Sequence, residues 1–363
     1  MSMSPAPRSG QFRHHGHRLA YELHGEDGAP PCVLVHGILF DSLLNRELAR
    51  RIARLGFQVA LIDLLGHGQS DRTTDPKDHR VDFYADQVLG LLDHLGWPHA
   101  VVGGVSLGCI TALTVAAKAP SRVDALFLEM PVMEWSAPWA ALLLAPVLVS
   151  ARYGALLHRR VARVIACVPR PPLDWLASGL NMASNDPRVI AAILHGVLVG
   201  PIVPTLAQRR MMKMPALIIG HRNDKLHEHR DARSLAVQLP NAKLLMARSI
   251  LDLRLRPDRL WPQIAPFFQS LLEAPQIHPV EPAAKPLPRK VAPRAATPTI
   301  RKPASGGRAG QKASVKKRGS GKVAAKKAAR KVAVKPAVTK QASARKTAAP
   351  KAAKRPQGAR ARR

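Results

Sequence analysis

Long apolar runs and cysteines are scarce in this chain of 363 residues. The longest apolar stretch, residues 137–150, is interrupted by Pro146 and is shorter than the roughly 20 residues that a membrane-spanning helix needs, so we expect no transmembrane segment. The three cysteines Cys32, Cys109 and Cys167 have no spacing typical of a disulfide framework or a zinc site. Residues 1–12 lack the apolar segment of a secretory signal. These absences favour a cytoplasmic protein.

Acidic and aromatic residues are almost missing from residues 275–363. This segment has 26 lysines and arginines against the single acid Glu281, and it contains no Phe, Trp or Tyr. It cannot bury enough apolar area to offset the entropy lost on ordering, so we expect a disordered tail. Its net charge of +25, out of +32 for the chain, predicts non-specific binding to nucleic acid or another polyanion, and association with the nucleoid where that polyanion is DNA. In composition it resembles the Lys/Ala/Pro-rich tails of linker histones.

Residues 16–274 have the pattern of an α/β domain, preceded by an N-terminal segment, residues 1–15, that we expect to be flexible. Short apolar runs, typical of buried parallel strands, occur at 32–35, 58–62, 100–102, 123–128, 216–219 and 242–246. Segments of helical periodicity lie between and after them, at 47–55, 83–95, 107–118, 230–239 and 257–272. This alternation predicts a mostly parallel sheet covered by helices on both faces. Residues 18–23 are expected to add an antiparallel edge strand.

One interval, residues 132–214, contains no strand pattern and many prolines among apolar and arginine-rich helical patches. Because about 80 residues are too many for a plain loop, we expect a helical lid over the sheet. Trp135, Trp139 and Trp175 either line an apolar pocket there or form the core of the lid itself. Arg159, Arg160 and Arg163 make a basic helical patch, most often only a solvated face.

Gly104-Val105-Ser106-Leu107-Gly108 follows an apolar strand and begins a helix. In this context G-x-S-x-G is typical of a nucleophile elbow, in which a tight turn holds the serine hydroxyl at the edge of the sheet. The N–H group of Leu107 then points toward the same space. An earlier strand ends in His36-Gly37-Ile38, so the N–H of Ile38 is expected to complete a two-donor oxyanion hole with Leu107.

A third motif, residues 63–70 (DLLGHGQS), follows the second core strand. With these three motifs in this order, residues 16–273 resemble the α/β-hydrolase superfamily, and in particular its capped members. The resemblance implies a Ser-His-acid triad, with Ser106 as the nucleophile. It fits cleavage of an ester, thioester or carbon–carbon bond in a small acyl substrate through an acyl-enzyme, with no cofactor. Relatives that break carbon–halogen bonds or epoxides carry an aspartate at the serine position.

The resemblance leaves two candidates for the acid. Asp224 lies four residues beyond Gly220, at the usual acid position after the strand that follows the lid. Glu129, at the end of the strand before the lid, matches the alternative position used by some relatives. We favour Asp224, because its arrangement is the more common one.

The sequence departs from the family at the histidine. The family base aligns at about Ser249 or Ile250, and no histidine occurs between His229 and His278. The candidates to replace it are His227, which we rank first, and His36, His195, His221 and His229. If none reaches Ser106, either the enzyme uses a mechanism that tolerates the loss or the chain is a binding protein on a hydrolase scaffold, because a serine without a base keeps only about 10³–10⁴ of rate enhancement. We expect no metal site, because neither His227-Glu228-His229 nor His14-His15-Gly16-His17 is followed by a third ligand at zinc-like spacing.

Overall fold

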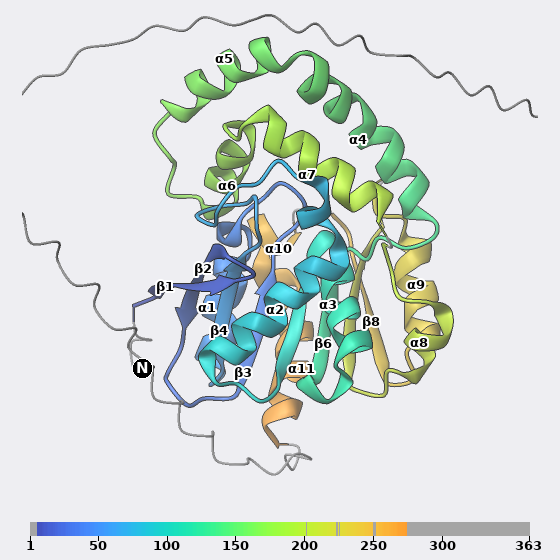
Figure 1. Cartoon of the computed structure of the whole chain (residues 1–363). Coiled ribbons are helices and arrows are strands. Elements are labelled where there is room, and N and C mark those ends of the chain that lie inside the picture. The colour runs from blue at the N-terminus through green and yellow to red at the C-terminus, as the bar shows by residue number, and fades with distance from the viewer. Residues whose placement is uncertain (1–5, 201, 223, 225, 250–251, 274–363) are drawn as a thin grey trace, which may run out of the picture. The chain divides into compact units, whose positions relative to one another are not determined.

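A single sheet forms the centre of the computed structural model, which describes residues 6–273 except 201, 223, 225, 250 and 251 (Figure 1). Its strands are β1 (Arg8–His14), β2 (His17–His24), β3 (Pro31–Val35), β4 (Gln58–Asp63), β5 (Ala100–Val105), β6 (Val123–Glu129), β7 (Ala216–His221) and β8 (Ala242–Ala247). Their order across the sheet is β1-β2-β4-β3-β5-β6-β7-β8. Pairing is antiparallel from β1 to β4 and parallel from β4 to β8. The tail, residues 275–363, and its expected disorder lie outside the described residues.

Helices cover both faces of the sheet, as the alternating pattern predicted. They are α1 (Arg46–Arg54), α2 (Val81–Leu95), α3 (Leu107–Lys118), α9 (His229–Gln238) and α11 (Trp261–Glu273), with the short α10 (Asp252–Leu255) before α11. Single turns of 3-10 helix lie at Ser42–Asn45, Pro76–His79, Pro120–Arg122 and Pro257–Arg259.

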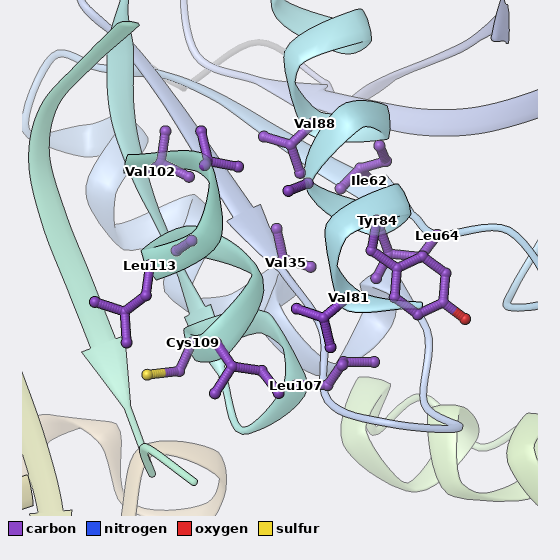
Figure 2. Packing of buried hydrophobic residues seen from close by; sticks show 14 of the residues in the cluster. Val35, Ile62, Leu64, Val81, Tyr84, Val88, Val102, Leu107, Cys109 and Leu113 are labelled. Atoms are coloured by element: carbon purple, nitrogen blue, oxygen red, sulfur yellow. The ribbon is translucent and has the colours of Figure 1, made fainter. Parts of the chain in front are cut away.

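Alternate side chains of each central strand enter two different cores. Val33 and Val35 of β3 pack with residues of α2, α3 and α9, whereas Cys32 and Leu34 pack with residues of α1 and α11. Figure 2 shows the first core, where Val35 lies among side chains of α2 and α3. This two-sided burial explains why the strands read as continuous apolar runs.

The order of the strands reverses beside β3. The chain passes from β3 outward to β4, and it then returns to the other side of β3 as β5. At such a reversal the loops after the two strands diverge and leave a crevice at their carboxyl ends. The loop after β3, with Ile38, and the turn after β5, with Ser106, both begin at this edge, because Val35 pairs with Gly104.

The N-terminal segment corrects two expectations. Residues 8–14 form β1 instead of belonging to a flexible segment, and β2 is therefore an inner strand rather than the edge. A tight turn at His15 and Gly16, both with positive φ, joins the two strands. Of the β1 side chains only that of Phe12 is buried, so the strand carries no apolar pattern in the sequence.

The described residues between β6 and β7 form five helices. They are α4 (Ser136–Tyr153), α5 (Ala155–Ala166), α6 (Asp174–Ala183), α7 (Pro187–Val199) and α8 (Leu206–Met211). Local sequence begins two of them: Asp186 caps α7 ahead of Pro187, and Thr205 and Gln208 form a capping box on α8. In Figure 1, α4 to α7 lie beyond the carboxyl ends of the strands. One contact between this insertion and the sheet is the hydrogen bond that Ser178 of α6 accepts from the N–H of Asp41, in the loop after β3.

Membrane-spanning length is not reached by any one helix of the described residues. Only α4 and α5 taken together are long and apolar enough, and they meet at an angle of 99°.

Candidate active site

Ser106 lies on the turn between β5 and α3 in a strained backbone conformation. Its φ of 54° and ψ of −109° are rare for a residue with a side chain and cost about 1–3 kcal/mol. The surroundings hold this conformation: the N–H of Ser106 donates to the carbonyl of Glu129 at 2.9 Å, and the Ser106 carbonyl accepts the first hydrogen bonds of α3. Ser106 itself is only partly buried.

The two glycines of the motif allow β3 to approach the elbow. A Cβ atom on Gly104 would lie 2.3 Å from the carbonyl oxygen of Val35, and one on Gly108 would lie 2.2 Å from the same oxygen. Neither position can therefore carry a side chain without moving β3 away from the turn. This close approach is the physical reason for glycine two residues on either side of Ser106.

His227 lies between Ser106 and Asp224. Its Nε2 is 2.9 Å from Ser106 Oγ, and its Nδ1 is 2.6 Å from Asp224 Oδ2. Because a carboxylate only accepts, Nδ1 carries the proton and Nε2 accepts the hydrogen bond of the serine hydroxyl. The structure thus brings together three of the residues singled out in the sequence, and acid and histidine lie three residues apart in one loop.

Asp224 also shapes the loop that carries the histidine. Its Oδ1 accepts hydrogen bonds from the N–H groups of Leu226 at 2.8 Å and His227 at 3.1 Å. Burial raises the pKa of Asp224. The interactions with His227 and the two backbone donors lower the pKa by more than burial raises it, so the pKa lies below its ordinary value. The carboxylate is therefore ionised at neutral pH and fixes the direction of the imidazole.

Glu129, the second candidate for the acid, is 1% exposed and pairs with a different base. Its Oε2 accepts a hydrogen bond from Arg254 of α10 at 2.8 Å, and its Oε1 lies 3.7 Å from His221 Nε2. Burial raises the pKa of Glu129, and Arg254 and His221 more than reverse this, leaving it below the ordinary value. No hydrogen bond joins Glu129 to His227 among the described residues.

None of the other candidate histidines forms a hydrogen bond with Ser106 within the described part of the chain. His221 Nδ1 donates to the carbonyl of Ser249 at 2.8 Å and so ties the end of β7 to the loop after β8. His36 is fully buried, His195 is exposed on α7, and His229 is the first residue of α9. Ile250, one of the two positions where the family histidine aligns, lies outside the described residues.

Two buried histidines hold the loop that carries Ile38. His36 Nε2 accepts from the N–H of Leu64, and His67 Nε2 accepts from the N–H of Leu39, whose φ is 66°. The two rings are 4.7 Å apart. Burial lowers the pKa of both, so both rings are neutral acceptors at neutral pH. Sequence reasoning assigned no role to His67, although its place between Gly66 and Gly68, directly after a buried strand, was a signal.

The N–H groups of Ile38 and Leu107 have no hydrogen-bond acceptor among the described residues. Leu107 is the first residue of α3, where a helix provides no acceptor for the N–H. Ile38 lies in the loop after β3, and no protein acceptor takes its N–H within the described part of the chain. Both residues therefore have the donors that an oxyanion site needs, at the edge where Ser106 lies.

The loop of Asp224 and His227 is also joined to the helical insertion. Asp231, fully buried in α9, accepts hydrogen bonds from the N–H groups of Met133 and Ser136 at the start of α4. Ser136 Oγ in turn accepts from the N–H of Glu228 at 2.8 Å. Asp231 escaped sequence reasoning because nothing in a helical pattern marks a buried carboxylate that caps another helix.

A polar groove lies at the carboxyl ends of β3 and β4. It lies between the loop after β3, the Gly68–Arg72 segment and α6, and it is lined by Leu39, Asp41, Gln69, Arg72, Asn181 and Asn185 among others. Within the described ranges no group of three or more His, Cys, Asp or Glu side chains is arranged to hold a metal ion, and this includes both histidine motifs noted in the sequence.

A model of the alpha/beta hydrolase fold family matches residues 30–153, which include β3, the elbow and Ser106. The chain has the α/β-hydrolase fold. Among solved α/β-hydrolase structures, the enol-lactonase of Burkholderia xenovorans LB400 is 21% identical and superimposes with a TM-score of 0.58, over 71% of this chain and 99% of the other.

Curated relatives share a shorter region. The dihydrolipoyllysine-residue acetyltransferase component of the acetoin cleaving system of Pseudomonas putida is 39% identical over 130 residues, or 35% of this chain and 33% of that protein. The 2-(acetamidomethylene)succinate hydrolase of Mesorhizobium japonicum is 31% identical over 106 residues, or 29% of this chain and 37% of that protein. The chain thus spans about a third of the length of these two curated relatives.

Proposed function

We propose that the chain is a serine hydrolase that cleaves an ester or a related acyl bond of a small molecule through an acyl-enzyme. The observation that carries this proposal is the 2.9 Å contact between Ser106 Oγ and His227 Nε2, backed by Asp224 at 2.6 Å from Nδ1. A hydroxyl becomes a useful nucleophile at neutral pH only when a base accepts its proton as it attacks.

The reaction divides into two halves. In the first, Ser106 Oγ attacks the acyl carbon while His227 Nε2 takes the hydroxyl proton, and the negative charge on the acyl oxygen is met by the N–H groups of Ile38 and Leu107. The leaving alcohol departs with the proton from His227. In the second, His227 takes a proton from water, the hydroxide adds to the acyl carbon, and Ser106 leaves with that proton. Asp224 stays ionised and stabilises the imidazolium formed in each half.

Two kinds of relative guide the choice of substrates. The names of the similar proteins include an enol-lactonase and a 2-(acetamidomethylene)succinate hydrolase. We therefore propose lactones and short aryl esters as the first substrates, with thioesters as a third class.

The test is labelling of the full chain by a fluorophosphonate, which reacts with activated serines. Labelling and ester turnover are expected in the wild type, and kcat is expected to fall by about 10⁴–10⁶ in both Ser106→Ala and His227→Ala, because triad members act as a unit. His229→Ala is the matched control, two residues along the same segment, and keeps wild-type labelling.

The alternative is a binding protein on a hydrolase scaffold. It is favoured if the wild type is not labelled. If His227→Ala is labelled as fast as the wild type, a base other than His227 activates Ser106. In either case the contact between His227 and Ser106 does not activate the hydroxyl.

A second proposal concerns residues 275–363, which carry a net charge of +25. We propose that this tail binds nucleic acid or another polyanion without sequence preference, through release of counterions. If six to ten charges contact phosphates, affinity for DNA falls by about 10³–10⁵ between 50 and 200 mM salt. Deletion of residues 275–363 is expected to abolish retention on DNA, and equal retention by the shortened chain would contradict the proposal.

A further inference from the structure

Large apolar side chains are exposed along α4 and α5, the outer helices of the insertion in Figure 1. Of the nineteen exposed large apolar side chains in the described part of the chain, eleven fall between residues 135 and 168. Leu156 and Leu157 are 78% and 69% exposed, and Trp139 on α4 is half exposed. The sequence predicted that the tryptophans line an apolar pocket or form the core of the lid. Trp135 and Trp139 do neither, because both are about half exposed. Exposed apolar area on this scale marks an interaction surface.

The same surface carries positive charge only. Residues 135–173 contain five arginines and no aspartate or glutamate. Arg152, Arg160 and Arg163 are exposed, and none of them forms an ion pair with a carboxylate of the described residues. A partner for this surface must therefore be both apolar and negatively charged.

On α5 the apolar and basic side chains share the side that faces away from the protein. The only buried residue of this helix is Ala162. Arg160 and Arg163 alternate with Leu157, Val161 and Val164, all of them exposed. Long arginine side chains at such positions can extend to phosphate groups while the apolar side chains between them enter the acyl region.

We propose that the outer surface of α4 and α5 docks on an anionic phospholipid bilayer and lies in its interface. The 99° bend between the helices, with Arg152 next to it, argues against a span across the bilayer. Anionic headgroups supply the missing negative charge, and the acyl boundary takes up the leucine and tryptophan side chains.

Two other occupants fit less well. The tail, with its net charge of +25, has the same sign as the arginines of this surface and is repelled by them. A second copy of the chain related by a two-fold axis would bring the two sets of arginines together, again at a cost in repulsion. The bilayer is the occupant whose charge and apolarity both match.

The experiment must separate this surface from the tail, which also binds anionic lipid. The full chain is mixed with vesicles of phosphatidylcholine and phosphatidylglycerol that contain brominated acyl chains, at high salt to weaken binding through the tail. Bromine quenches only tryptophans that enter the bilayer, so quenching is expected in the wild type and is expected to drop sharply in Trp139→Phe.

Two sets of variants test the apolar and the charged parts. Leu156→Asp with Leu157→Asp is expected to lower vesicle partitioning by at least about tenfold. Val237→Asp on α9, an equally exposed apolar position away from α4 and α5, is the matched control and keeps wild-type quenching. Arg160→Glu with Arg163→Glu is expected to lower quenching by anionic vesicles more than quenching by purely neutral ones. Quenching is the readout because the tail, which contains no tryptophan, keeps its own preference for anionic vesicles. These side chains are exposed, so all variants should melt at the wild-type temperature.

Three results would overturn the proposal. One is co-sedimentation with vesicles without any quenching, which would mean that the tail alone binds. Another is unchanged partitioning in the Leu156 and Leu157 double variant. The third is a dimer in sedimentation velocity that this variant dissociates, with no quenching by vesicles, which would assign the surface to a second copy. None of these readouts depends on the proposed chemistry at Ser106.

Discussion

A buried carboxylate lies at or just after the end of each of the neighbouring strands β6 and β7. The two carboxylates have different kinds of partner. Glu129, the last residue of β6, is held by Arg254, and Asp224, just after β7, is held by His227. A guanidinium stays protonated at every pH at which the protein is folded, so the first pair is a fixed pair of charges. An imidazole accepts and releases a proton near neutral pH, so we propose that the second pair is the one that takes part in proton transfer.

The comparison shows that burial beside the elbow is not enough to identify a catalytic acid. Both carboxylates have a pKa below the ordinary value, and in both cases burial opposes a stronger effect of the basic partner. What separates them is the identity of that partner and whether it also reaches Ser106 Oγ, as His227 does.

Between the two carboxylates, the largest expected effect comes from Asp224→Asn. An asparagine cannot hold His227 in the tautomer that leaves Nε2 free to accept, so kcat for a substrate of the proposed class is expected to fall by about 10⁴. The measurement is steady-state kinetics on the full chain. Glu129→Gln is the paired control and is expected to stay within about tenfold of wild type. Equal losses in the two variants would remove the distinction between the carboxylates.

A second effect concerns stability. Glu129→Gln leaves the buried Arg254 without its counter-charge, and removal of one partner of such a pair typically costs about 3–5 kcal/mol in the free energy of unfolding. Denaturant titration measures this loss. Asp86→Asn, which breaks a half-exposed pair with Lys118, is expected to cost no more than about 1 kcal/mol.

Adding Arg254→Met to Glu129→Gln provides the check on that explanation. If the unpaired guanidinium causes the loss, the double variant is more stable than Glu129→Gln alone. A further loss in the double variant would show that Arg254 stabilises the protein through other contacts.

The smallest effect is on the pH dependence of stability. The pKa of Glu129 is lower in the folded chain than its ordinary value of 4.5, so below about pH 4.5 the unfolded chain binds a proton that the folded chain does not. The free energy of unfolding therefore falls as the pH drops from about 4.5 through the folded pKa. Denaturant titration across this range should give a flatter slope for Glu129→Gln, and an unchanged slope would mean that other groups dominate acid unfolding.

The fold followed from the sequence because its signals are local and periodic. Continuous apolar runs identified β3 to β8, and glycine spacing identified the turn at Ser106, where the carbonyl of Val35 leaves no room for a Cβ. The strand β1 gave no such signal, because it is an edge strand with one buried side chain. This strand forms because it pairs with β2 across a hairpin, and such pairing leaves no periodic pattern in the sequence.

The partners of Ser106 were harder to predict. His221, His227 and His229 lie within nine residues, and the direction of each side chain depends on backbone angles in an irregular loop. The turn set by Asp224 Oδ1 directs His227 toward Ser106, and the end of β7 directs His221 toward Ser249. Sequence reasoning ranked His227 first on its place in the loop, and its catalytic role stays a prediction.

The short distance in sequence between Asp224 and His227 has a consequence for protein engineering and for inheritance. Where the acid and the histidine lie on two separate loops, each loop must be positioned by its own contacts. Here one stretch of four residues, from Asp224 to His227, carries both side chains. Such a stretch can be gained, lost or transplanted in one event. Among the described residues, the hydrogen bonds that run from Asp224 to Ser106 use no side chain of the segment after β8, whose Arg254 holds Glu129 instead.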